Sequence, residues 1–365
     1  MLKGRFFYYL LCVNAAVNTT IYVPVILIDH QGKGALLSIF AAVVAGGLFL
    51  VLFNGVIKAY PSKGLPEMLS GANPFIRTGL LLLAAVSWFW AGLTMILAFM
   101  EISNRYINPV APDLFVLFAF FLVIGPAIRM RSTSILFAVE IVLFIIAPFV
   151  FFVFYKGITS ENLQLNGILA TITHAAPFPH FGSVAAASFI FSGYANMIIF
   201  NRHFPATFRI KKIWLLTLIG LCMLLFTFFI PIGILGTAGV KMYPFPWVAT
   251  ADAIRLEFFV IERLLFLFLI IDIAISLLSI IIHWHVSLEC LKALFTQKAA
   301  MQSKEGIISW LAVCFMILIT AIISHFLNES LVFNFNVWFL NVRFLEEALL
   351  IAILLILARR RRKKS

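Results

Sequence analysis

Polar side chains interrupt long apolar runs in this sequence, and Asp272 is the most informative of them. Ser276, Ser279 and His283 follow it at helical spacing, so the four side chains are predicted to share one face. A carboxylate near the bilayer centre costs about 2.5–3.5 kcal/mol on insertion scales, so it normally faces the interior of a helix bundle. Asp272 could hold a substrate amine, bind a cation or carry a proton. A structural pair with Arg263, or with a polar group on a neighbouring helix, is the alternative.

Two further clusters of small and polar residues lie in apolar runs, one in each half of the chain. They are Asn14, Asn18, Thr19 and Thr20 in the first half, and Ser192, Gly193, Tyr194 and Asn196 in the second. Unpaired backbone groups at membrane depth are tolerated only where they line a cavity or are buried in protein. Matching interruptions in both halves therefore predict a ligand pocket. The alternative is that these side chains only hold helices together through hydrogen bonds.

A third apolar run, 80–100, carries Ser87, Trp90 and Thr94 near one helical face. Trp90 and Thr94 complete the predicted ligand-binding set. That set is Asn14, Asn18, Thr19, Trp90, Thr94, Ser192, Gly193, Tyr194, Asn196 and Asp272. Glu262 and Arg263 are adjacent, and adjacent helix positions do not face each other. Each is therefore predicted to form a structural ion pair with a partner of its own.

The composition indicates an integral membrane protein. Hydrophobic residues make up 63% of the 365 positions and charged residues 12%, whereas soluble domains carry roughly 25% charge. The net charge of +12 does not indicate nucleic-acid binding, because the basic residues lie in short connections and one terminal cluster. The four cysteines have no metal-like spacing, and neither a metal nor a cofactor is expected. The first apolar run lacks a cleavage site and is predicted to be a membrane helix.

Ten runs are apolar enough to be membrane spans, each of which needs about 20 residues. They are Phe6–Ile28, Ala35–Ile57, Leu80–Met100, Leu114–Ile128, Ile135–Tyr155, Val184–Phe200, Ile213–Ile234, Phe258–His283, Ile307–Phe326 and Val337–Leu357. The fourth and sixth runs are short, and the tenth has charged residues in its first half. The sequence therefore predicts an all-α polytopic membrane protein with one transmembrane domain, 1–357, and a basic tail, 358–365.

Lys and Arg are distributed unevenly between the two sides that these runs define. With the N-terminus inside, twenty of the 27 lie on the cytoplasmic side and Arg263 lies within the eighth run. The six on the outer side are Lys33, Arg105, Lys156, Lys241, Arg255 and Arg343. The positive-inside rule then places both termini in the cytoplasm, and the basic tail is predicted to anchor at the anionic inner leaflet. The long outer connections, 156–183 and 235–257, could hold small helices over an outer vestibule.

Ten spans also allow two inverted five-helix repeats, about 6–155 and 184–357, in which helices 1 and 6 are broken at mid-membrane. The N-termini of the half-helices would favour a carboxylate, and a nearby acid would favour an amine. The predicted ligand is therefore an amino acid or a similar zwitterion.

Three segments carry a resemblance to a known family. They are Tyr60–Glu67 after the second run, Tyr243–Pro246, and the later run Phe259–Leu264. In their order and spacing, and together with the basic tail, they resemble the spore germination permease-like proteins. These are the B subunits of germinant receptors and belong to the amino acid–polyamine–organocation transporter superfamily. The resemblance covers essentially the whole chain.

The resemblance implies a nutrient sensor in the spore inner membrane. Such a subunit would bind a small germinant, often an amino acid, in a transporter-like pocket and trigger germination. Its expected partners are a receptor A subunit and a C lipoprotein. A proton- or sodium-coupled amino acid transporter, with Asp272 as the coupling group, is the alternative. An enzyme is not expected, because the sequence contains no HExxH, GxSxG or Walker motif.

Overall fold

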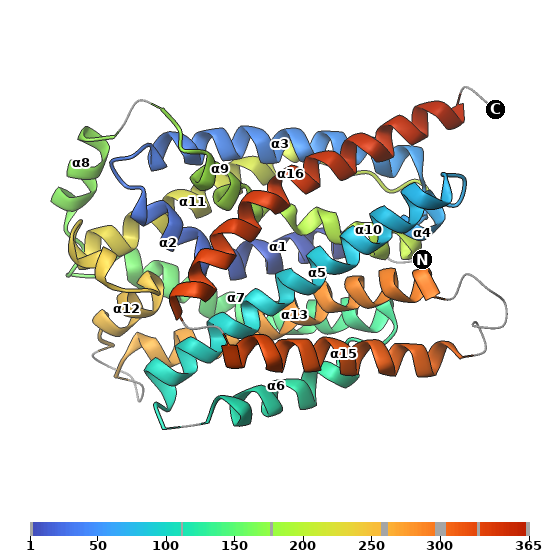
Figure 1. Ribbon diagram of the computed structural model, residues 1–365. Helices are drawn as coiled ribbons and strands as arrows, with labels where there is room; N and C mark the ends of the chain where they lie inside the picture. Colours follow the sequence, from blue (N-terminus) through green and yellow to red (C-terminus); the bar gives the residue numbers. More distant parts are fainter. Residues whose placement is uncertain are drawn as a thin grey trace.

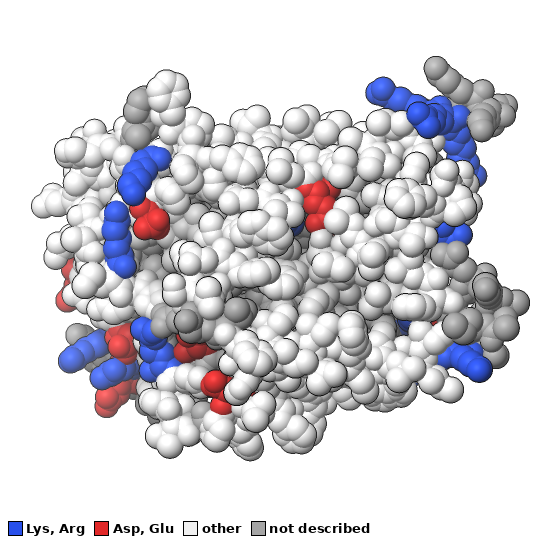
Figure 2. Space-filling view, in the orientation of Figure 1, with Lys and Arg blue, Asp and Glu red and all other residues white. Residues whose placement is uncertain are grey.

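The computed structural model describes residues 3–110, 112–175, 178–256, 262–295, 304–326 and 329–362. The regular structure in these ranges is helical, apart from one isolated antiparallel bridge between Arg255 and Arg263. Most of the helices run along a common axis, and both chain termini lie at the same end of the bundle (Figure 1). Figure 2 shows charged side chains gathered at the two ends of one face, with a broad, largely uncharged band between them.

The helices follow the apolar runs of the sequence. In chain order they are α1 (Arg5–Thr20), α2 (Tyr22–Asp29), α3 (Ala35–Ala59), α4 (Leu65–Met68), α5 (Pro74–Ile102), η1 (Ser103–Ile107), α6 (Asp113–Ala127), α7 (Ser132–Ile158), α8 (Leu165–Thr173), α9 (Phe181–Ser188), η2 (Phe189–Asn196), α10 (Met197–Phe200), η3 (Asn201–His203), α11 (Ile213–Leu235), η4 (Gly239–Met242), α12 (Pro246–Ala253), α13 (Leu264–Phe295), α15 (Glu305–Phe326) and α16 (Glu329–Arg362).

Within the described ranges, seven helical segments are long and apolar enough to cross a membrane, or eight if the bent pair α1–α2 is counted as one span. The seven are α3, α5 with η1, α7, α9 through η3, α11, α13 and α15. Helix α6 is apolar but has only 15 residues, and α16 has 34 residues with charges near its middle. The chain is therefore an all-helical, multi-pass membrane protein.

Each predicted run overlaps a helical segment, but two boundaries need correction. Helix α13 begins at Leu264, after Arg263, and continues to Phe295; the predicted start at Phe258 lies outside the described residues. Helix α16 continues to Arg362, so the first part of the predicted tail is helical. The remaining tail residues, 363–365, lie outside the described ranges.

The first membrane passage is bent by 46° at Ile21, which separates α1 from α2. Pro24 explains the position of this break, because it has no N–H to donate to the Thr20 carbonyl and its ring clashes with that carbonyl in a regular helix. The hydroxyls of Thr19 and Thr20 donate to the carbonyls of Ala16 and Val17 at 2.8 and 3.0 Å. Such bonds back to the preceding turn often bend helices.

The sixth passage is not broken, which corrects the expectation of a second interruption. Residues 181–203 form one continuous 23-residue helical segment, although the hydrogen bonding changes from α to 3₁₀ over η2. This segment contains no proline, so every residue can still donate to the helix. The polar cluster 192–196 therefore alters the helix pitch without separating two half-helices.

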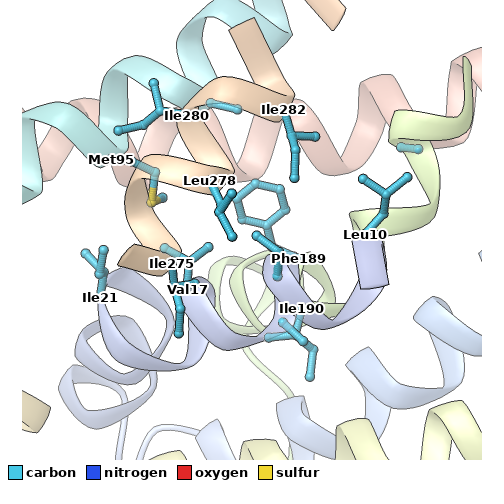
Figure 3. Packing of buried hydrophobic residues seen from close by; sticks show 14 of the residues in the cluster. Leu10, Val17, Ile21, Met95, Phe189, Ile190, Ile275, Leu278, Ile280 and Ile282 are labelled. Atoms are coloured by element: carbon cyan, nitrogen blue, oxygen red, sulfur yellow. The ribbon is translucent and has the colours of Figure 1, made fainter. Parts of the chain in front are cut away.

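The core lies where α1, η2, α5 and α13 meet. Figure 3 shows side chains from these helices, among them Val17, Phe189 and Leu278, converging between the ribbons. All three are at most 5% exposed. Large apolar side chains on the bundle exterior, such as Val44 and Phe144, are exposed. A bundle that is apolar inside and outside is what a lipid environment requires.

Candidate functional site

Helices α1 and η2 touch where the sequence predicts part of the pocket. Asn14 Nδ2 donates to the Phe189 carbonyl at 2.6 Å, and Asn18 Nδ2 donates to the Asn14 carbonyl at 2.7 Å. A Cβ atom added at Gly193 would lie 2.6 Å from Leu11 Cα. The two backbones therefore approach too closely for a ligand to fit here. Asn14 and Gly193 join the two helices in this conformation, whereas Asn18 bonds back to the preceding turn of α1.

The break in the first passage brings the end of α1 to Asp272 on α13. Thr20 Oγ1 donates to Asp272 Oδ1 at 3.0 Å, and Asp272 is 2% exposed. Asp272 Oδ2 and Ser276 Oγ have no hydrogen-bond partner within the described part of the chain. The carbonyl of Thr19, beside the break, accepts a bond from Thr227. The negative end of a helix next to an unsatisfied carboxylate oxygen suits an amine, a proton or another small cation.

Thr94 and Trp90 lie one helical turn apart on α5 and have different neighbours. The Tyr22 hydroxyl, at the start of α2, donates to the Thr94 carbonyl at 3.4 Å, so Thr94 contacts the residue just after the break. Trp90 stacks on Phe335 of α16, with ring centroids 4.1 Å apart. Trp90 Nε1 is buried and, among the described residues, has no hydrogen-bond acceptor. Of the two, Thr94 is the one that hydrogen bonds connect toward Asp272, through Tyr22 on α2 and Thr20 on α1.

The other predicted residues line a separate small cavity of about 40 Å³. Its polar lining consists of Ser192, Tyr194 and Asn196 from η2, with Ser87, Trp88, His283, Arg343, Glu346 and Glu347. Trp88 Nε1 donates to Asn196 Oδ1 at 2.7 Å. A single water needs about 10–15 Å³ by this measure. The cavity can therefore hold a few waters but not an amino acid.

The charged residues expected in the first half of the tenth run lie on α16. Arg343, which was counted on the outer side, lies near the middle of this helix and is 7% exposed. Its guanidinium donates to Glu347, to Ser192 Oγ, and to Ser188 Oγ at 2.9 Å. The sequence contained a signal for this buried group: the spacing of Arg343, Glu346 and Glu347 puts all three on one helical face.

A larger hollow of about 690 Å³ opens at the end of the bundle opposite the two chain termini, the end that the sequence predicts to be outer. Its lining includes Tyr22, Asp29, Glu101, Arg105, Lys241 and Tyr243. Figure 1 shows α8 and α12 at this end, within the connections where small helices were expected. Ligand pockets usually measure about 300–1,000 Å³. This hollow, called the vestibule below, therefore has room for an amino acid and offers charges of both signs.

At the opposite end of the bundle, a network of five charged side chains joins several helices. Arg202 contacts Glu67 and Glu289, each at 2.9 Å. Lys292 contacts Glu289 at 2.7 Å and Glu305 at 2.6 Å. These bonds join α4, η3, α13 and α15.

The segment that carries the family resemblance, Tyr60–Glu67, forms part of this network. Asn201 Nδ2 donates to the carbonyls of Tyr60 and Lys63 at 3.0 and 2.9 Å. Ser62 Oγ donates to the Phe204 carbonyl at 2.7 Å. The segment is thereby fastened to the inner end of the sixth passage.

Glu262 and Arg263 lie before α13, at the outer end of the bundle. Arg263 contacts Asp252 at 3.0 Å and forms the backbone bridge with Arg255. The Glu262 carbonyl accepts a hydrogen bond from Leu256 N at 2.9 Å. The acid that partners Arg263 is therefore Asp252.

Comparisons with known proteins identify no family for this chain. It matches no protein-family model, and a search of curated proteins finds no relative.

Proposed function

We propose that this chain is the membrane B subunit of a spore nutrient-germinant receptor. It would bind a small germinant, an amino acid or a similar zwitterion, and trigger germination. The support comes from the resemblance of its motifs to the spore germination permease-like proteins. It comes also from the bent first passage, whose break lies beside Asp272 and near an open vestibule.

The break at Ile21 is the observation that carries the proposal. The C-terminal end of α1 and the N-terminal end of α2 meet there, so a partial negative and a partial positive charge lie side by side. Asp272 adds a full negative charge on the α1 side. An amine would bind at Asp272 and the end of α1, and a carboxylate would bind at the start of α2.

In this conformation the ligand would enter from the vestibule. Tyr22 lines the vestibule and also contacts Thr94, so it lies between the open space and the break. For the ligand to bind between α1 and η2, these two helices must separate, because Gly193 packs against α1. A germinant would drive that change only if it binds the separated state more tightly.

We also propose the number of membrane spans, the side on which the termini lie and the internal repeats. The eight spans that include the bent pair become ten if α6 and α16 also cross. Both termini would then be cytoplasmic, in a spore inner membrane, and residues 6–155 and 184–357 would form inverted repeats. The partners would be a receptor A subunit and a C lipoprotein.

A germination assay tests the proposal. Spores that lack this chain are exposed to a panel of amino acids and sugars, and are then complemented with the wild type, Asp272→Asn or Asp113→Asn. Asp113 is an exposed acid at the start of α6 and serves as the matched control. We expect deletion to abolish the response to at least one nutrient. Asp272→Asn should raise the half-maximal nutrient concentration at least about tenfold, the equivalent of about 1.4 kcal/mol. A deletion that changes no response in the panel would refute the receptor role.

A proton- or sodium-coupled amino acid transporter is the second candidate, and the unpartnered Oδ2 of Asp272 within the described ranges favours it. Uptake of the same amino acids into proteoliposomes separates the two functions. A sensor should bind its ligand without net accumulation. A transporter should accumulate the ligand and lose that activity in Asp272→Asn.

A further inference from the structure

The charged cluster on α16 forms a second buried site, which does not depend on the proposed function. Arg343, Glu346 and Glu347 are 7%, 9% and 7% exposed. Their spacing puts them on one face of α16, toward η2 and α5. Figure 2 shows an acidic patch within the uncharged band. Figure 1, in the same orientation, shows the middle of α16 at this place.

Arg343 contacts the sixth passage through its two terminal nitrogens, whereas its Nε has no hydrogen-bond partner among the described residues. Its guanidinium donates to Glu347 and to Ser192 Oγ. It also donates to the Ala185 carbonyl and to Ser188 Oγ, each at 2.9 Å. Ser192 Oγ donates in turn to Glu347 Oε2 at 2.8 Å. Arg343 and Glu347 therefore form a neutral pair that fastens α16 to α9 and η2.

Glu346 has a different environment. Its Oε2 accepts a hydrogen bond from Ser87 on α5, and a serine brings no charge. If both carboxyls are ionised, Arg343, Glu346 and Glu347 together carry one excess negative charge. An unbalanced charge in a buried site is expensive, so the cluster requires one more positive charge.

The small cavity beside these residues shows what that charge can be. It lies next to Glu346 and Glu347, and Glu347 Oε1 has no hydrogen-bond partner in the described ranges. His283 lines it too, and its Nδ1 lies 2.7 Å from the Ser279 carbonyl, which can only accept. Nε2 of the neutral ring is therefore an acceptor as well.

The described residues contain no group of three or more His, Cys, Asp and Glu side chains that could hold a metal ion. The volume of about 40 Å³ accommodates water. A proton that exchanges through cavity water supplies the positive charge, needs no metal ligands and fits this volume.

We propose that Glu346 is a proton-exchange site. The protonated carboxyl balances the cluster, and on release the proton passes to a cavity water, leaving a carboxylate and a hydronium ion. The titratable and charged groups that line the same cavity are Arg343 and Glu347 from α16, Tyr194 from η2 and His283 from α13. From α5 the cavity receives Ser87, which does not titrate.

Loss of this proton has a mechanical consequence. The new carboxylate at Glu346 competes with Glu347 for Arg343, whose other bonds hold α16 against Ser188 and Ser192. Deprotonation therefore weakens the contact between α16 and the sixth passage. The site links proton binding to the relative position of these two helices.

Infrared spectroscopy of the full chain in lipid nanodiscs tests the proposal through the carbonyl stretch of a protonated carboxylic acid. At about pH 7 we expect this band in the wild type and its loss in Glu346→Gln. Ser87→Ala should shift the frequency of the band, because it removes the hydrogen bond to Glu346. Ser192→Ala is the matched control: it removes a bond to Glu347 and should leave the frequency unchanged.

Charge balance also predicts how the infrared band changes in two further variants. Glu347→Gln should abolish the band, because Glu346 then becomes the only counter-charge of Arg343. Arg343→Gln should roughly double its intensity, because both carboxyls then need a proton. Asp272→Asn should leave the Ser87-sensitive band in place.

Three results would overturn the proposal. The first is a band that persists unchanged in Glu346→Gln, and the second is a band that shifts with Ser192→Ala instead of Ser87→Ala. The third is a band that disappears in Asp272→Asn, which would place the proton at Asp272.

Discussion

Individual polar residues inside this bundle serve two different purposes. Asn14 donates to the Phe189 carbonyl at 2.6 Å and so holds α1 against η2, and Asn18 donates to the Asn14 carbonyl of its own helix at 2.7 Å. Asp272 keeps one carboxylate oxygen without a partner in the described ranges, which is costly in a structural residue. The difference separates residues that only join helices from a residue that is available to a ligand.

Gly193 is predicted to be intolerant of any side chain. A Cβ atom there would lie 2.6 Å from Leu11 Cα and 2.8 Å from the Leu10 carbonyl, so α1 or η2 must shift. We expect Gly193→Ala to destabilise the protein by about 1–3 kcal/mol. Thermal unfolding in detergent measures this effect.

Gly79→Ala is the matched control for Gly193→Ala. Gly79 lies on α5, and a Cβ atom there meets no described atom within 4 Å. Alanine should stabilise an exposed helix position by up to about 1 kcal/mol. Equal melting temperatures for the two variants would contradict the close contact between α1 and η2.

A pair of histidines at the outer end gives a prediction about pH. The rings of His30 and His180 are stacked, with centroids 3.9 Å apart. Desolvation, then His30 and Lys33, lower the pKa of His180 below its usual value, while Asp29 opposes them. The folded state therefore binds fewer protons at His180 than the unfolded state. The stacked contact should be retained above about pH 6.5 and weaken as the pH falls through the lowered pKa.

Hydrogen exchange of residues 178–184 checks this expectation. Protection should fall on acidification in the wild type and change less in His180→Gln, which cannot gain the charge. The same acid response in both proteins would show that His180 is not responsible.

The residue scale also shows where sequence reasoning succeeds and fails. Asp272 was identified because one acid in a long apolar run must have a reason to be there. Arg343 was misplaced because its partners, Ser188 and Ser192, are more than 150 positions away. That pairing depends on how α16 packs, which local composition does not encode.

At the scale of elements, proline decides which of the two expected breaks occurs. Pro24 bends the first passage at Ile21, whereas the sixth passage has no proline and stays continuous. Both passages contain clustered polar residues, so composition alone predicted the same result for both. The missing information was backbone hydrogen bonding, since Ser, Gly and Asn can remain within a helix and Pro24 cannot donate.

The ion-pair network at the end of the bundle near the termini provides a prediction for a contact between helices. Arg202 joins Glu67 and Glu289, and the neighbouring Cys290 is fully buried. Arg202→Gln should loosen this end and raise the rate of maleimide reaction at Cys290 about tenfold, as a shift of about 1.4 kcal/mol would produce. The measurement uses a protein in which Cys12, Cys222 and Cys314 are replaced by serine.

Arg209→Gln is the control for this experiment. Arg209 bonds backbone carbonyls, those of Ala206 and Phe208, and not the acids of the network. Its substitution should leave the reactivity of Cys290 near that of the parent. An equal increase in both variants would mean that the network around Arg202 does not control access.

At the scale of the whole molecule, the two ends of the bundle differ. The vestibule of about 690 Å³ at one end contains charged side chains of both signs, and the bonds of Arg202 and Lys292 join helices at the opposite end. The sequence predicted the membrane class and the order of the helices, because apolar runs of sufficient length encode both. It did not predict which end is open, because that depends on long-range contacts.

Ligand binding to the purified full chain tests the central claim most directly. The protein in nanodiscs is titrated with each of the common amino acids, and its melting temperature is followed in the wild type and in Asp272→Asn. We predict that at least one amino acid raises the melting temperature of the wild type in a saturable way, and that Asp272→Asn weakens this effect at least about tenfold in concentration. If no amino acid stabilises the wild type, or if Asp272→Asn responds like the wild type, there is no zwitterion site at the break in the first passage.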